Sequence, residues 1–399
     1  MSSKRPKLDH QRTAMNDNIR EETPASVVEY EYTGSDHHVP NNMTHVRIHP
    51  TVTKIESWSF HNRRSLKEVV FNEGLVCIGM NAFCGCTALQ SINIPSTVIE
   101  IDHDAFRSCT GLKEVVLNEG LTIIGSSAFH DCKSLQSITI PSTVDEISMT
   151  VFIRCNSLRE VVLSDGLKKI AGHSFQSCTS LQSITIPSTV DEIGSSAFYS
   201  CTDLQDVVLN ERTKRIKISA FAKCTSLRSI KLPSAVIEID RHAFRDCLEL
   251  REVVIHNEEV QIGDYAFENC SSLERFKFQN HSLLNRLDNI IQAGQRGIEA
   301  KLDDIPGLEW RGGELSVPTV HRPSYFGAVE TIAMVDKEKL DKIKGLISYY
   351  EMKEATTLFE LALWKAKIDQ ADISNADRAA CRVEVPGPVK DTILQYLRR

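Results

Sequence analysis

The sequence has no run of eighteen or more apolar residues, and its N-terminal segment, MSSKRPKLDHQRTAMNDNIREE, lacks the apolar stretch of a secretory signal. These absences predict neither a membrane span nor export, so we expect an intracellular protein, cytoplasmic or nuclear. With a formal net charge of -7, the chain also lacks the basic excess of a protein dedicated to nucleic acid. No nucleic-acid partner is therefore expected.

Catalytic signatures are missing as well. The sequence contains no G-x-S-x-G, Walker, H-E-x-x-H or Rossmann fingerprint. We therefore expect no enzyme activity, no catalytic residue, no cofactor, no bound metal and no small-molecule substrate. One alternative is an enzyme housed in residues 320–399, where acidic residues are abundant but no His or Cys accompanies them at a useful motif spacing.

What the sequence does contain is a 23-residue period without insertions. The fourteen residues SLQSITIPSTVDEI occur at 134–147 and again at 180–193. Leucine keeps the period from Leu66 to Leu273, and cysteine keeps it from Cys86 to Cys270. Phenylalanine keeps it at Phe60, Phe83, Phe106, Phe129, Phe152, Phe175, Phe198, Phe221, Phe244 and Phe267. Calling one repeat a rung, we predict about eleven rungs between residues 43 and 279.

A single rung explains why the pattern must recur. Ile138 and Ile140 have the spacing of a strand with one face inward, and Pro141 ends that strand. About seven inward side chains at ~2 kcal/mol each stabilise a rung by about 14 kcal/mol, against ~1–2 kcal/mol of backbone entropy for each residue. One rung alone therefore cannot fold, and stability comes from stacking neighbours.

A second period of two rungs underlies the 46-residue echo. Rungs that read EVV or DVV alternate with rungs that read SI and carry a proline four residues after the serine. In an in-register parallel stack, this alternation roughly doubles the ~5 Å separation of like charges. Recent duplication of a two-rung unit is the other explanation, and the two are compatible.

The unit AFxxCxxLxxIxIPxxVxxIG, as in SAFHDCKSLQSITIPSTVDEIS, resembles the BspA-like class of leucine-rich repeats. This class is known from bacterial surface proteins and from unicellular eukaryotes, and we expect the intracellular eukaryotic type. The resemblance implies a parallel-β leucine-rich repeat solenoid that binds proteins or surfaces and shares no catalytic motif. A cell-surface adhesion protein is the alternative. Thr213 and Glu259 depart from the pattern, because a polar residue replaces the usual Val or Leu.

The strand face of the solenoid is the candidate interaction surface. A rigid face with acidic residues, a valine stripe and a basic C-terminal end suits docking of a protein partner, although such residues also simply make good strands. We therefore predict a non-enzymatic scaffold whose partner is a protein. The candidate partner-binding residues are Glu68, Val70, Glu114, Val116, Glu160, Val162, Asp206, Val208, Lys231, Arg275 and Lys277.

The phased cysteines invite a metal or redox interpretation, but we predict small buried residues at a corner, reduced and unpaired. Stacked side chains point in parallel, whereas a disulfide needs converging Cβ atoms. Histidines 37, 38, 45 and 49 also cluster, and we interpret them as part of a polar loop rather than a metal site.

The remaining regions complete the predicted organisation. Residues 1–26 are expected to form a disordered polar tail, in which Lys4, Arg5, Pro6 and Lys7 resemble a nuclear localisation signal. Residues 27–279 are expected to form the solenoid with its N-terminal cap, and 280–319 a helical cap and linker; GLEWRGGELSVPTVHRP, at 307–323, is predicted to be a connector. Apolar residues at helical spacing predict a small, mainly α-helical C-terminal region at 320–399.

Overall fold

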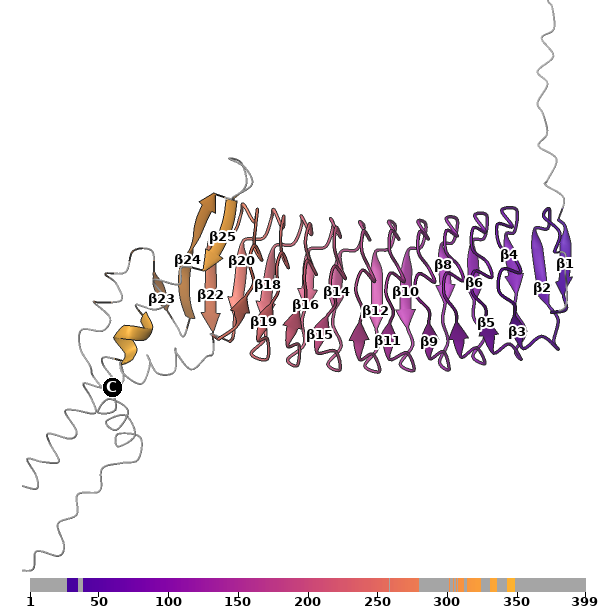
Figure 1. Ribbon diagram of the computed structural model, residues 1–399, viewed down its shortest axis with the longest axis horizontal. Helices are drawn as coiled ribbons and strands as arrows, with labels where there is room; N and C mark the ends of the chain where they lie inside the picture. The colour runs from indigo at the N-terminus through magenta and orange to yellow at the C-terminus, as the bar shows by residue number, and fades with distance from the viewer. Residues whose placement is uncertain are drawn as a thin grey trace, which may run out of the picture.

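The computed structural model describes residues 27–34, 39–257, 259–279, 301, 304, 306, 308–311, 314–323, 331–335 and 343–348. Parallel strands stack side by side into a rod (Figure 1), and the predicted leucine-rich repeat solenoid is thereby confirmed. Each of the first ten rungs contributes one longer and one shorter strand, and the eleventh contributes a longer strand, so the rod has two strand-bearing faces.

The longer strands form the face that we call the strand face. It begins at β1 (Glu29–Tyr32), which pairs in parallel with the first rung. The eleven rung strands are β2 (His45–Ile48), β4 (Glu68–Val70), β6 (Ser91–Asn93), β8 (Glu114–Val116), β10 (Ser137–Ile140), β12 (Glu160–Leu163), β14 (Ser183–Thr185), β16 (Asp206–Val208), β18 (Ser229–Leu232), β20 (Glu252–Ile255) and β22 (Arg275–Gln279).

The two-residue strands form the opposite face, called here the short-strand face. Their parallel pairing joins residues 23 apart, as in Ile147 with Ile170 and Ile193 with Ile216. They are β3 (Lys54–Ile55), β5 (Cys77–Ile78), β7 (Glu100–Ile101), β9 (Ile123–Ile124), β11 (Glu146–Ile147), β13 (Lys169–Ile170), β15 (Glu192–Ile193), β17 (Arg215–Ile216), β19 (Glu238–Ile239) and β21 (Gln261–Ile262).

The ten phased phenylalanines form one column through the interior of the rod. Their side chains are at most 1% exposed, and successive ring centroids lie 4.9–5.6 Å apart with nearly parallel planes. Tyr32 meets Phe60 edge-on at one end, and Phe276 meets Phe267 edge-on at the other. The column is therefore closed at both ends by a T-shaped aromatic contact, an arrangement that the ring quadrupole favours.

Each phenylalanine lies at a corner between two residues of positive φ. In the rung of Phe152, for example, these residues are Thr150 (φ 61) and Arg154 (φ 59). A residue with a β-carbon adopts this left-handed conformation at an energetic cost. Most rungs place Asn, Asp, Ser or His at these two positions, which are the residue types that tolerate the conformation best after glycine. The two bends turn the chain around the ring and return it to the next strand.

The two polar departures from the repeat behave differently. Thr213 is fully buried and keeps its rung in register, since Arg215 pairs with both Glu192 and Glu238 across the ladder. Glu259 instead points outward and its side chain is 77% exposed. Its Oε1 lies 3.4 Å from the Nζ of Lys344, in the helix of residues 343–348. Ile343 and Ile347 of this helix are buried in the hydrophobic core.

The C-terminal end of the rod corrects part of the sequence analysis. Three strands follow β22, where a connector and then helix were predicted: β23 (Glu309–Arg311), β24 (Glu314–Pro323) and β25 (Thr331–Val335). β24 pairs antiparallel with β22 and thus covers the edge of the last rung (Figure 1). The sequence ELSVPTVHRP contains prolines, but the open edge of β22 offers a hydrogen-bonding partner that local sequence does not reveal. The segment 280–300, predicted to form a helical cap, lies outside the described residues.

Candidate protein-interaction surface

The strand face displays the predicted residues in alternating order. From β4 to β18, each strand of this face buries its second residue and exposes the first and the third, as β8 does with Glu114, Val115 and Val116. The stripe of exposed valines comprises Val70 at 39%, Val116 at 40%, Val162 at 44% and Val208 at 55%. Ser91, Ser137 and Ser183 lie in the intervening rungs with Asn93, Thr139 and Thr185, so rungs with large side chains alternate with rungs of smaller ones.

The acidic residues in the middle of this face have no ion-pair partner in the part of the chain that the structure describes. Among the described residues, Glu114, Glu160 and Asp206 form no ion pair, and their strand positions are exposed. The register places a serine between them, since Ser137 pairs with Glu160 and Ser183 with Asp206. These three carboxylates are therefore spaced two rungs apart and remain available to an external cation.

The two ends of the strand face are different. At the N-terminal end, Glu68 Oε2 lies 3.6 Å from His45 Nε2, beside a hollow of about 460 Å³ that Glu31 and Arg47 also line. At the C-terminal end the predicted basic surface is partly used within the chain. Lys277 Nζ lies 2.8 Å from Glu252 Oε2, and Arg275 and Lys277 are half-buried.

The valine stripe also ends before the last rungs. Val254 occupies the next stripe position in β20, but it is only 2% exposed. Its register neighbour Lys231 is exposed and marks the last open rung. Of the candidate residues, those from Glu68 to Lys231 thus share one exposed surface, whereas Arg275 and Lys277 lie where this surface closes.

The short-strand face has a charge pattern of the opposite kind. From β11 to β17 acidic and basic rungs alternate, so the carboxylates of β11 and β15, and of the residues just before them, lie beside cations of the next rung. The pairs are Lys168–Asp145 at 3.6 Å, Lys169–Glu146 at 2.9 Å, Lys214–Asp191 at 3.3 Å and Arg215–Glu192 at 2.7 Å. This ladder neutralises its own charges, as cross-strand pairs of opposite sign do.

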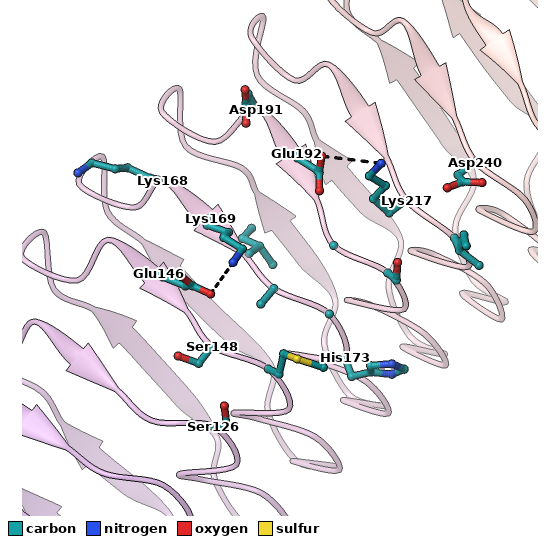
Figure 2. A pocket seen from close by; sticks show the side chains of 17 residues that line it. Ser126, Glu146, Ser148, Lys168, Lys169, His173, Asp191, Glu192, Lys217 and Asp240 are labelled. Atoms are coloured by element: carbon teal, nitrogen blue, oxygen red, sulfur yellow. Dashed lines mark hydrogen bonds and ion pairs between the residues drawn. The ribbon is translucent and has the colours of Figure 1, made fainter.

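A groove of about 1060 Å³ lies on the short-strand face (Figure 2). Gly172 leaves its wall without a side chain between Met149 and Ser195. Figure 2 shows Lys169 turned toward Glu146 and Lys217 toward Glu192, the latter pair 3.9 Å apart. Lys169 and Lys217 are therefore already paired with carboxylates of the groove and are not free to orient an anionic ligand. Sequence reasoning missed this ladder, although opposite charges 23 residues apart would have predicted it.

The nine phased cysteines are buried and free, as predicted. Each thiol donates a hydrogen bond to the carbonyl of the phenylalanine in the preceding rung, for example Cys155 Sγ to Phe129 O at 3.2 Å. The same carbonyl accepts the backbone N–H of Cys132, so cysteine ties two rungs to one acceptor. Burial raises the pKa of Cys86 and Cys201 to about 12, which keeps these thiols protonated. Sequence reasoning predicted their burial but not this hydrogen bond.

The other motifs give no second site. Within the described part of the chain, no group of three or more His, Cys, Asp or Glu residues could hold a metal ion. His45 lies in β2 rather than in the predicted polar loop, because it continues the strand ladder, and His49 follows that strand; His37 and His38 lie outside the described residues. The basic motif Lys4–Lys7 also lies outside them. No helix among the described residues has the length and apolar character needed to cross a bilayer.

Comparison with known proteins identifies the family. The BspA type leucine rich repeat region, six copies, matches residues 38–159 and 146–274. A leucine-rich repeat protein from Bacteroides ovatus is 25% identical with a TM-score of 0.39, and the match covers 62% of this chain and 81% of that one. A leucine rich cell surface protein from Faecalibacterium prausnitzii is 28% identical with a TM-score of 0.36, covering 64% and 84%. No curated protein matches. The family match spans more than half of the sequence, so the chain belongs to the BspA-type leucine-rich repeat family.

Proposed function

We propose that this BspA-type protein is a non-enzymatic scaffold that binds a protein partner along the strand face, between Glu68 and Lys231. The family has a repeat architecture typical of protein interaction or surface adhesion. The observation that carries the proposal is the contrast between the two faces. From Asp145 to Glu192, the carboxylates of the short-strand face are paired with lysine or arginine of the next rung, whereas Glu114, Glu160 and Asp206 on the strand face are exposed without an ion pair among the described residues.

Charge left unpaired in regular positions beside an apolar stripe favours binding in two ways. It accelerates encounter with a complementary partner, and the stripe supplies the apolar area that excludes water. The exposed valines lie two residues from the acids in the same strands, so both contributions act on one surface.

A site-specific photocrosslinker tests this proposal in the native cell. Benzoylphenylalanine in place of Val116 or Val162 should crosslink to a specific protein, identified by mass spectrometry. Ile123 and Met149 on the other side of the rod are similarly exposed, at 49% and 54%, and provide matched control positions. Crosslinking to the same proteins with equal yield from all four positions would exclude the strand face as the binding surface.

We also propose that the protein acts inside the cell, in the cytoplasm or the nucleus. Support comes from the basic motif at Lys4–Lys7 and from cysteines that are free throughout the described residues. A fluorescent fusion with Lys4→Ala and Arg5→Ala should lose nuclear accumulation relative to the unchanged fusion. Labelling of intact cells by a membrane-impermeant reagent would instead support the adhesion alternative.

A further inference from the structure

The two-rung spacing of the strand face points to the shape of the partner. Successive phenylalanine steps next to β8, β10 and β12 are 5.5 Å and 5.6 Å, so two rungs advance about 11 Å along the column. Neighbouring strands within a sheet lie about 4.8 Å apart, which gives about 9.6 Å for the same two rungs. The exposed acids and the exposed valines thus each repeat about every 9.6 to 11 Å along the rod.

This interval matches the rise of an α-helical heptad. Seven residues at 1.5 Å each advance about 10.5 Å, and a residue repeated every seven drifts only ~20° around a straight helix. A β-strand does not fit as well, because two residues advance about 6.7 Å and three residues reverse the side-chain direction. A polyproline II helix repeats every ~9.3 Å, which falls below the interval.

Side-chain size along the strand face supports the same geometry. Rungs with Glu and Val alternate with rungs that expose Ser and Thr, so large exposed side chains recur every two rungs with smaller ones between them. A helix lying along the rod could place one side chain per heptad over each rung of small residues. The rungs follow one another in a nearly straight line (Figure 1), so a straight helix could span several of them.

The charge pattern restricts the helix further. Lys67, Lys113 and Arg159 are exposed immediately before the acids Glu68, Glu114 and Glu160. A uniformly basic chain would be repelled by these flanking cations. A helix with a single basic residue per heptad, next to an apolar residue, can pair with the acids and cover the valines without that repulsion.

The chain itself contains a contact of this type at another place. In the helix of residues 343–348, Ile343 and Ile347 are buried against the solenoid core, and Lys344 lies 3.4 Å from Glu259. A helical i, i+4 apolar pair with an adjacent lysine therefore packs on a rung and neutralises its exposed carboxylate.

We propose that the partner segment is an amphipathic α-helix that lies along the rod axis, with one basic and one apolar residue per heptad opposite the stripes of Glu114, Glu160 and Asp206 and of Val116, Val162 and Val208. This inference rests on the proposed function, because it assigns the partner class to the same surface. Three rungs of each stripe correspond to a helix of about three heptads.

Synthetic peptides and the full-length protein test the proposal. The probe is a fluorescent 21-residue helical peptide with one Lys and one Leu per heptad, four residues apart, and its affinity is measured by fluorescence anisotropy at low and physiological salt. A peptide of the same composition and helicity, with Lys and Leu distributed around the helix, is the control. We expect the heptad peptide to bind at least tenfold more tightly and to weaken as salt increases.

Protein variants locate the binding. Combining Glu114→Lys, Glu160→Lys and Asp206→Lys should weaken binding of the heptad peptide at least tenfold. Combining Glu73→Lys, Asp165→Lys and Glu211→Lys changes the net charge equally at exposed turn positions and should leave binding within about twofold. Circular dichroism and thermal unfolding verify that both variants fold.

The outcomes separate this inference from the proposed function. Equal affinity for both peptides, equal effects of the two triple variants, or tighter binding of a polyproline II peptide with Lys at every third position would overturn the helical partner. If the strand-face crosslinks then still identify a protein, the scaffold function stands without the helix. If those crosslinks are absent, the proposed scaffold function is excluded, whatever the peptides show.

Discussion

The phenylalanine column makes a strong prediction about how the rod loses its structure. Phe152 is fully buried, between the rings of Phe129 at 5.6 Å and Phe175 at 5.3 Å. Replacing a buried phenylalanine with alanine costs about 3–5 kcal/mol, including the loss of two stacked pairs of about 0.5–1.5 kcal/mol each. Because each rung contacts only its neighbours, Phe152→Ala should weaken the rod locally rather than everywhere.

Hydrogen exchange measured by mass spectrometry can detect this local loss. Amides between residues 129 and 175 should exchange about 10²- to 10³-fold faster in Phe152→Ala, which is the range expected for about 3–4 kcal/mol. Rungs near Phe60 and Phe267 should change much less. Ile153→Ala, a neighbouring side chain that is only half-buried, is the control. Uniformly faster exchange along the rod, or an equal effect of the control, would refute nearest-neighbour stability.

Three further predictions concern thiols, ion pairs and pH. At pH 8 a thiol-specific reagent should modify the partly exposed Cys77 and Cys84 first. Cys86 and Cys201, with a pKa of about 12, should react only after denaturant is added. Rapid modification of all phased cysteines in the folded protein would contradict their burial. Glu192→Gln should lower the free energy of unfolding by less than about 1 kcal/mol at low salt, and the difference should disappear in about 0.5 M sodium chloride. Glu114→Gln should leave the free energy of unfolding unchanged, and urea titrations of both variants measure these values. Burial lowers the pKa of His130, so below about pH 6.5 the unfolded chain binds more protons than the folded one, and stability should fall as the pH decreases through that range. His130→Gln should reduce the slope of the free energy of unfolding against pH. An unchanged slope would show that other groups cause it.

Most of the solenoid could be predicted from the sequence because its period is exact to the residue. A slip of one residue would turn Val115 outward and Glu114 inward, and would do the same to the equivalent residues of the other rungs. The burial pattern therefore specifies one register. The exposed acids and valines follow from the same register. The strand face was therefore predictable residue by residue as far as Lys231.

The parts that were not predicted depend on contacts outside the repeat. Burial of Val254 and the ion pair of Lys277 occur where the rungs meet the C-terminal strands. β24 forms because β22 presents an open edge, which the local sequence of β24 does not encode. The bond from Cys155 to the carbonyl of Phe129 joins residues 26 apart, an offset that differs from the 23-residue period and is set by how the corners of neighbouring rungs pack.

The two-rung alternation also restricts how the length of this protein can change. Removing 46 residues, which is two consecutive rungs, would keep an acidic rung next to a serine rung at the new junction. The shorter rod would show the same alternation of side chains. Deleting only the rung of Ser137 would place Glu114 directly beside Glu160, with like charges about 4.8 Å apart. Gene variants that lengthen or shorten the array should therefore differ by even numbers of rungs.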